Sequence, residues 1–285
     1  MNLFSNPKWI NQYEYPFTTI DEVPQSLFNS INLRLDSRLN TNPLVSIIVI
    51  AYNEEINLLR TISTLSKLCT KIPFEIVVIN NNSTDRTQEL IEKLHIRHFF
   101  QPIQGWGPSR QLGQEMALGK YVLLADADCL YPPNWLDEMM QKLNQPGVIC
   151  VYGRYSFIAT ADIPRWQFQL YELLKDCLTE FRHYKRPYLN AYGLSMGYQR
   201  DIGLKVGYVQ RYLRGEDGRL CFDMMSYGKV VQMKTRSARV WTFPRTLLRD
   251  GSLWQCLKIR IYKELHQLFS YLTPHPPHDT RNSFN

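Results

Sequence analysis

The first half of the chain alternates short apolar stretches with amphipathic ones. The apolar stretches are rich in β-branched residues and bounded by turn residues, as in the buried strands of a parallel sheet. The stretches between them repeat apolar residues every three or four positions, as a helix with one buried face does. The predicted elements are strands over 44–51, 74–79, 98–101 and 121–125 and helices over 55–68, 86–95 and 109–118, the second helix capped by Ser83 or Thr84. This order predicts an α/β fold with a doubly wound, Rossmann-like, mostly parallel sheet flanked by helices.

The second half of the chain is less regular and predicts a smaller, mixed part of the fold. The expected elements are helices over 136–143, 163–186, 219–226 and 253–272, strands over 148–157, 229–233 and 238–241, a Gly-rich connection over 190–198 into another strand, and a loop over 214–218. Two of these helices are strongly amphipathic. The helix over 163–186 has its apolar positions at Trp166, Leu170, Leu173, Leu174, Cys177, Leu178 and Phe181. We expect this face mainly to pack against the rest of the protein.

The N-terminal residues 1–42 are rich in Asn, Pro and Ser and predict an extension packed over the domain, with a helix near 24–39. The longest apolar run covers only Leu44–Tyr52, whereas a membrane-spanning helix needs about 20 residues. The first residues show no basic stretch followed by an apolar one, so we expect no signal peptide. The six cysteines have no metal-site spacing, which favours reduced thiols in a cytosolic protein.

The net charge of +7 is concentrated in one segment. Residues 233–263 contain eight basic residues and one acidic residue, so the remainder of the chain is close to neutral. Such a segment predicts an anionic partner, either phosphate groups or a lipid surface. It contains no recognised nucleic-acid-reading module, so we expect no nucleic-acid partner. Because the basic residues flank the amphipathic stretch over 253–272, we hypothesise peripheral contact of that stretch with an anionic bilayer.

Polar clusters follow the predicted strands at their carboxyl ends, where open α/β sheets bind ligands. They are the sequences YNEE over 52–55, NNNSTD over 80–85 and DAD over 126–128, and a later loop contains Glu216 and Asp217. Asp126 and Asp128 can bring two carboxylates to one hard cation. The alternatives are a solvated turn for the two aspartates and, for Glu216 and Asp217, an acidic pair stabilised by a helix dipole.

This ordered set of motifs resembles the family 2 glycosyltransferases with the GT-A fold, over about residues 43–245. The resemblance implies a nucleotide-binding half over 43–130, an acceptor-side half over 131–245, and a basic C-terminal helix and tail over 246–285. It implies inverting transfer of a hexose-type sugar from a nucleotide sugar, with UDP favoured, to a hydroxyl group on a glycan or lipid carrier. It also implies a divalent Mn²⁺ or Mg²⁺ ion, and a cytoplasmic protein that is either free or peripheral on the inner face of the membrane and serves cell-envelope polysaccharide.

The resemblance also assigns roles to individual residues. The implied nucleotide-binding residues are Ala51, Tyr52, Asn53, Glu54, Asn80, Asn81, Arg110, Asp126 and Ala127. The implied metal ligands are Asp128 and Asp126, and the implied general base is Asp217 with Glu216 beside it. The implied lining of the donor-sugar and acceptor side is Gly193, Leu194, Ser195 and Met196, with the helix over 163–186 as a candidate wall.

Two departures from the family pattern concern the donor and the metal. Asn80 and Asn81 stand where the family often has two aspartates, so the preference for uracil is less secure. The stretch 239–244 contains no histidine at the position where some GT-A enzymes place a metal ligand. Two rival functions remain open. One is a sugar nucleotidyltransferase, disfavoured because no Gly-rich basic loop follows the first strand, and the other is a non-catalytic domain that binds a nucleotide sugar or a partner.

Overall fold

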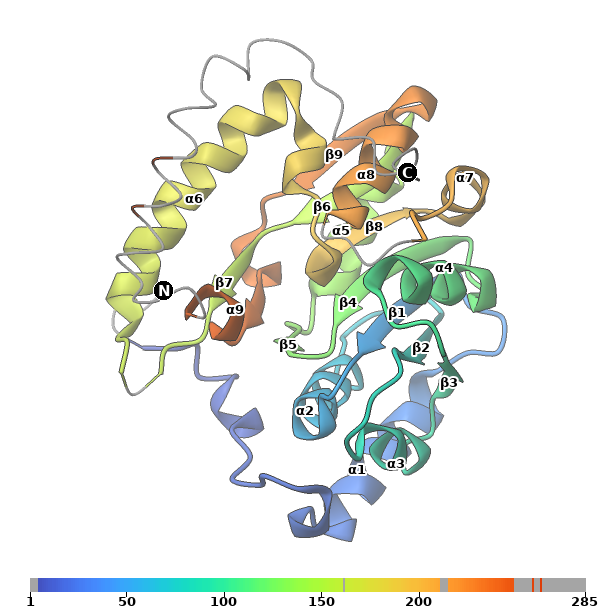
Figure 1. Cartoon of the computed structure of the whole chain (residues 1–285), viewed down its shortest axis with the longest axis vertical. Helices are drawn as coiled ribbons and strands as arrows, with labels where there is room; N and C mark the ends of the chain where they lie inside the picture. The colour runs from blue at the N-terminus through green and yellow to red at the C-terminus, as the bar shows by residue number, and fades with distance from the viewer. Residues whose placement is uncertain (1–4, 161, 211–214, 249–257, 259–261, 263–285) are drawn as a thin grey trace.

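The computed structural model of the protein describes residues 5–160, 162–210 and 215–248, together with 258 and 262. At its centre lies a seven-stranded sheet in the order β3-β2-β1-β4-β8-β6-β9, with helices on both faces (Figure 1). The strands of this sheet are β1 (Val45–Ala51), β2 (Phe74–Asn80), β3 (Arg97–Phe100), β4 (Tyr121–Asp126), β6 (Val148–Gly153), β8 (Met196–Gln199) and β9 (Lys229–Met233).

The first half of the chain forms the parallel part of the sheet. β1 pairs in parallel with β2 on one side and with β4 on the other, and β3 pairs in parallel with β2. Every residue of β1 and β2 is buried, which explains their continuous apolar sequences. Ala51 lies opposite Asn80, and Ile50 lies opposite Asp126, so three strands end at nearly the same level. The prediction of a mostly parallel α/β sheet is confirmed.

Helices cover both faces of the sheet because successive residues of a buried strand point to opposite sides. Ile47 and Val49 lie in one core with α1, α2, α3 and α5, whereas Ile48 lies in a second core with α4, α7 and α8. The helices are α1 (Gln25–Arg38), α2 (Glu55–Leu65), α3 (Thr87–Glu92), α4 (Trp106–Met116), α5 (Trp135–Leu143), α6 (Arg165–Lys185), α7 (Arg200–Val206), α8 (Glu216–Met224) and α9 (Arg245–Leu248). The helix expected near the N-terminus is therefore present as α1.

The second half of the chain adds antiparallel pairing. β8 runs antiparallel to both β4 and β6, and β9 runs parallel to β6. A separate three-stranded sheet contains β5 (Cys129–Leu130), β10 (Val240–Thr242) and β7 (Tyr155–Phe157). The prediction of one strand over 148–157 is wrong, because the chain leaves the large sheet at Arg154 and enters the small one. The guanidinium of Arg154 pairs there with Asp176 and Glu180 of α6.

Helix α6 is amphipathic as predicted, but it buries a different face. Toward the protein it presents Phe168, Tyr171 and a buried ion pair in which Arg165 Nη2 lies 2.7 Å from Glu172 Oε2. The face expected to pack is exposed, at Trp166, Leu170, Leu173, Leu174, Cys177 and Phe181. Buried charges need partners, and Arg165 and Glu172 satisfy each other on the face that packs against the protein. The apolar residues therefore lie on the outward face.

The start of α3 also differs from the prediction. The helix begins at Thr87, whose backbone N–H donates to Asp85 Oδ1. Ser83 and Thr84 do not cap it, because both bond to Asn53 on the neighbouring loop.

Within the described residues, no helix is both long and apolar enough to cross a bilayer. The helix predicted over 253–272 lies outside the described residues, except for positions 258 and 262.

Candidate functional site

The loops after β1 and β2 are joined by asparagine side chains. Asn53 has a left-handed backbone with φ of 53°, and its Oδ1 accepts a hydrogen bond of 2.8 Å from the backbone of Thr84. Asn80 bonds to Ser83 in its own loop and to Gln88 of α3, so its side chain is already occupied. Asparagine suits these positions because one amide can both accept and donate.

Asn81 connects the loop after β2 to the start of α4. Its backbone N–H donates to the carbonyl of Ala51, and its side-chain oxygen accepts from the backbone of Gly105. Both Asn80 and Asn81 are buried, whereas Tyr52 has 41% of its surface exposed. Of these three predicted nucleotide-binding residues, Asn80, Asn81 and Tyr52, only Tyr52 has a side chain open to solvent, and Asn53 beside it is exposed as well.

Arg110 lies in the second turn of α4, and its guanidinium is buried among three carboxylates. Nε lies 2.8 Å from Asp217 Oδ1 and 3.3 Å from Glu216 Oε1, while Nη2 lies 3.3 Å from Asp126 Oδ1. The structure thus brings together Asp126 at the end of β4 and two acids about 90 residues later. α8 begins at Glu216, so this acidic pair lies in a helical first turn and not in the expected loop.

Gly193 completes the cluster from a third part of the chain. Its backbone N–H donates to Asp217 Oδ2 over 2.7 Å. A Cβ at this position would lie 1.8 Å from Arg110 Nη2, so a side chain and the guanidinium cannot both fit. Glycine is required here by the close approach of Arg110.

The carboxylates of the cluster have raised pKa values. Loss of hydration raises the pKa of Asp217 well above its ordinary value; Glu216 and Asp126 raise it further, and Arg110 opposes them. Asp217 Oδ1 lies close to Arg110 Nε but has no hydrogen-bond partner among the described residues. Partial burial likewise raises the pKa of Asp126 to about 6, although 36% of its side chain remains exposed.

A second arginine contacts the other predicted metal ligand. Arg245 Nη2 lies 2.5 Å from Glu54 Oε1 and 2.8 Å from Asp128 Oδ2. Arg245 begins α9, three residues after β10, and so reaches the site from the far end of the described chain. The sequence analysis did not select it. The signal available was its place directly after 239–244, the stretch where the family resemblance led us to look for a metal-binding histidine.

Asp126, Asp128 and Cys129 form a candidate cation site, with one ligand atom from each within 4.8 Å of the others. Carboxylate oxygens suit Mg²⁺ or Mn²⁺, which are hard cations. The Cys129 thiol is buried, and loss of hydration raises its pKa well above the ordinary value, so it remains protonated. The two aspartates therefore fit a divalent cation, and the cysteine does not add a ligand of the appropriate kind.

Two of the residues expected to line the donor-sugar and acceptor side lie in the interior instead. Ser195 is buried and accepts a hydrogen bond from Trp135 Nε1, and Met196 is wholly buried in the core. Leu194 is half-buried and its carbonyl accepts from Tyr131 Oη. Ala127 is also buried. The assignment of the Ser195 and Met196 side chains to an open site is corrected.

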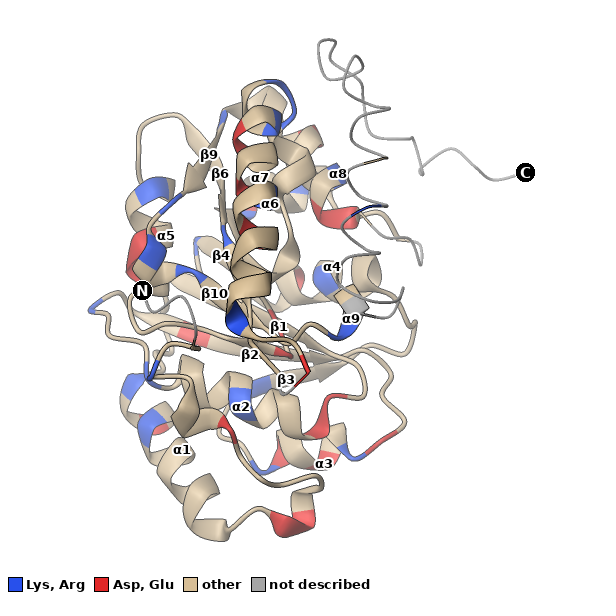
Figure 2. Ribbon diagram, turned by 90° about the vertical axis from the view of Figure 1, so that its left-hand side faces the viewer, with Lys and Arg blue, Asp and Glu red and all other residues tan. Residues whose placement is uncertain are grey.

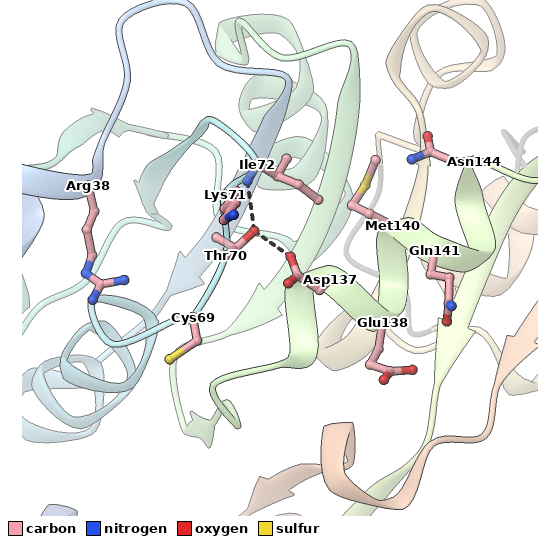
Figure 3. Close-up of a pocket in the computed structure, with 10 residues that line it drawn as sticks. All are labelled: Arg38, Cys69, Thr70, Lys71, Ile72, Asp137, Glu138, Met140, Gln141 and Asn144. Carbon is pink, nitrogen blue, oxygen red and sulfur yellow. Dashed lines mark hydrogen bonds between the residues drawn. The ribbon is translucent and has the colours of Figure 1, made fainter.

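A surface cavity of about 840 Å³ lies elsewhere, at the amino-terminal end of β2 (Figure 3). It is lined by Arg38, by the segment 69–72 that precedes β2, and by residues of α5. Figure 3 shows Thr70 bonded to Asp137 within it. None of the carboxylates around Arg110 or Arg245 lines this cavity, so we do not assign the chemistry to it.

Comparison with known proteins identifies the family. A model described as "Glycosyl transferase family 2" matches residues 46–206, which is more than half of the chain. The chain belongs to glycosyl transferase family 2. This match confirms the resemblance found in the sequence, and it covers β1, β4 and Arg110 but not Glu216, Asp217 or Arg245.

Similar family 2 proteins and solved structures agree with this assignment. An uncharacterised glycosyltransferase of Haemophilus influenzae is 31% identical over 122 residues, which are 40% of this chain and 48% of that protein. A mannosyltransferase of Pyrobaculum calidifontis, solved with GDP-Man and Mn²⁺, has a TM-score of 0.56 at 16% identity and covers 89% of this chain and 74% of its own. S. aureus TarS 1-349, solved with UDP-GlcNAc, has a TM-score of 0.51 at 18% identity and covers 70% of this chain and 58% of its own.

These structural similarities confirm the GT-A fold. The chain spans less than half the length of curated relatives such as the H. influenzae protein.

We predict that Gly193→Ala destabilises this family 2 protein by about 1–3 kcal/mol, the usual cost of overpacking a filled interior. The added methyl group would displace the Arg110 guanidinium from Asp217. Urea unfolding of the variant and the parent protein measures the difference. An unchanged free energy of unfolding would mean that Arg110 has room to move and is not confined as described.

Proposed function

We propose that this protein is an inverting glycosyltransferase that moves a sugar from a nucleotide-sugar donor to a hydroxyl group. The observation that carries the proposal is the cluster around Arg110, where the end of β4 and the first turn of α8 meet. Direct displacement at a sugar carbon requires a cation beside the leaving diphosphate and a proton acceptor beside the attacking hydroxyl. The membership of family 2 and the nucleotide sugars in both related structures support the same reaction.

Asp217 is the proposed general base. The acceptor oxygen attacks the sugar carbon, the bond from that carbon to the diphosphate oxygen breaks, and the hydroxyl proton passes to Asp217. A base needs a raised pKa, and Asp217 has one; Gly193 occupies only its Oδ2, while its Oδ1 pairs with Arg110 Nε and makes no hydrogen bond among the described residues. Arg110 and Gly193 would hold the carboxylate in position during the transfer.

Asp128 and Asp126 are the proposed metal ligands, and Mn²⁺ or Mg²⁺ is the proposed ion. The bound ion would supply positive charge beside the diphosphate as negative charge develops there. Arg110, on the opposite side of Asp126, keeps that carboxylate oriented. Cys129 packs in the core beside these aspartates and is not a proposed ligand.

The donor and acceptor are proposed only by class. Tyr52, Asn53 and Glu54, with the loop after β2, are the proposed contacts of the nucleoside. A UDP-hexose remains the first candidate donor, although the related structures include one with GDP-Man and one with UDP-GlcNAc. A glycan or lipid carrier is the proposed acceptor, with Gly193 and Leu194 near it. Residues 43–245 form the proposed catalytic domain, acting in the cytoplasm or at a membrane surface.

We predict that Asp217→Asn lowers kcat by about a hundredfold to ten-thousandfold, the usual contribution of a general base. Donor affinity should change little, because asparagine keeps an oxygen for the Gly193 N–H. The measurement is transfer from a panel of UDP- and GDP-sugars with Mn²⁺, together with calorimetric donor binding. Asp223→Asn is the matched control, since it makes the same change on α8 in a pair with Arg219. Donor binding without turnover in the parent protein would favour the non-catalytic alternative.

Arg245 bears on metal binding because it already pairs with Asp128. Its guanidinium is about half exposed and donates to both Asp128 and Glu54, so it partly neutralises the Asp128 carboxylate that a cation would use. A cation that binds Asp128 must compete with this pair. Since half-exposed ion pairs are weak, the competition should be modest.

We predict that Arg245→Gln lowers the Kd for Mn²⁺, without donor, by roughly two- to fivefold, the equivalent of up to about 1 kcal/mol. Titration of free Mn²⁺ by electron paramagnetic resonance measures this directly. Lys234→Gln removes the same charge from a surface pair with Glu180 and is the control for long-range electrostatics. An equal or weaker Mn²⁺ affinity in Arg245→Gln would contradict the proposed competition.

A further inference from the structure

The outward face of α6 is an apolar surface that the described residues leave uncovered. Trp166, Leu170, Leu173 and Leu174 are 44%, 41%, 61% and 42% exposed, and they follow one another at helical spacing. Figure 1 shows α6 along one side of the molecule, and Figure 2 shows the same helix facing the viewer across the front of the ribbon. A contiguous apolar surface of this kind usually has an occupant.

Polar contacts on the inward face of α6 fix the rotation of the helix about its own axis. Glu172 receives the buried guanidinium of Arg165 and the backbone N–H of Phe157. Asp176 pairs with Arg154 and with Arg239. Turning α6 to bury its leucines would break these ion pairs and leave the largely buried guanidinium groups of Arg154 and Arg239 without their carboxylate partners, which is costly. The outward residues are therefore left for a further segment or a partner to pack against.

The chain itself arrives at α6 just where its described part ends. Leu247 of α9 is buried against Phe168 and Tyr171, in the amino-terminal half of α6. Five residues lie between Leu247 and Leu253, and the six Cα–Cα steps that join the two span up to about 20 Å. The following segment can therefore reach the outward face beginning near Trp166.

That segment has the length and pattern of a matching helix. It contains 20 residues, 253–272, and α6 contains 21, so the two would each span about 30 Å. Its apolar positions are Leu253, Trp254, Leu257, Ile261, Leu265, Leu268 and Leu272. Lys258 and Tyr262, its two described positions, are helical and exposed, as expected of residues beside such a stripe.

We propose that residues 253–272 pack as an amphipathic helix along the outward face of α6, extending the contact that Leu247 begins. A short tether gives the segment an effective concentration in the millimolar range, which favours it over an untethered occupant. The surface does not depend on the proposed catalytic function. It replaces the bilayer hypothesis for 253–272, because the same apolar stripe cannot face α6 and lipid together.

Cysteine cross-linking in the full chain tests this packing. Cys177 lies exposed on the outward face of α6 and provides one thiol. In a background with Cys69→Ser and Cys256→Ser, single substitutions Ile261→Cys, Leu265→Cys and Leu268→Cys provide the second. The matched control is Lys263→Cys, which lies on the opposite side of the same predicted helix. A short bismaleimide should link Cys177 to one or more of the stripe positions at least tenfold faster than to position 263.

A second variant separates packing from chance collision. Leu173→Glu should reduce the cross-linking rate by at least fivefold, whereas Leu33→Glu, on a leucine of α1 that is also exposed, should leave it unchanged. Circular dichroism checks that each variant is folded.

Three outcomes would overturn the proposal. They are equal rates at all four positions, links that form only between two chains, or links that disappear when vesicles of phosphatidylglycerol and phosphatidylcholine bind the protein. The last outcome would assign the face and the segment to a bilayer.

Discussion

The buried guanidinium of Arg110 is the interaction on which the site depends. It enters from α4, in the parallel half of the fold, and contacts carboxylates from β4 and α8. A buried charge of this kind is stable only when its partners are fixed around it. The arginine therefore constrains three separate parts of the chain at once, and the position of Asp217 relative to Asp126 follows from it.

Several local features become intelligible from this constraint. Gly193 has no side chain because Arg110 fills the space, and its freed N–H holds Asp217. Loss of hydration raises the pKa values of Asp126 and Asp217, and the excess of carboxylates over guanidinium groups in the cluster raises them further. A negative excess at the end of β4 attracts a cation, and Arg245 fills part of that role at Asp128. The proposed metal and the proposed base thus arise from the same imbalance of charge.

The sequence predicted the parts of the structure that depend on local pattern. Continuous apolar runs marked β1 and β2, and the acids after β4 were recognised as unlike a buried strand. The sequence did not predict which side chains far apart in the chain pair with one another. In α6, the buried ion pair Arg165–Glu172 lies on the face toward the protein, and the apolar residues lie outward. Residue spacing alone does not predict which of these two faces of the helix is buried.

Arg245 was missed for a related reason, since only the folded chain brings it across to Glu54 and Asp128. Ser195 and Met196 were assigned to the lining of the donor-sugar and acceptor side because the segment 194–199 matches the family's lining segment. Both side chains are buried, Ser195 beside Trp135 of α5 and Met196 in the core with α4, α7 and α8, and the resemblance did not specify the direction of a side chain.

The most direct test of the central claim is a double-mutant cycle between Arg110 and Asp217, measured as the free energy of unfolding in urea. The variants are Arg110→Met, Asp217→Asn and the two combined. If the buried pair joins the two halves of the site, the combined variant loses less stability than the sum of the single ones, by about 1–3 kcal/mol. Effects that add to within about 0.5 kcal/mol would show that the two residues do not interact, and would contradict this account.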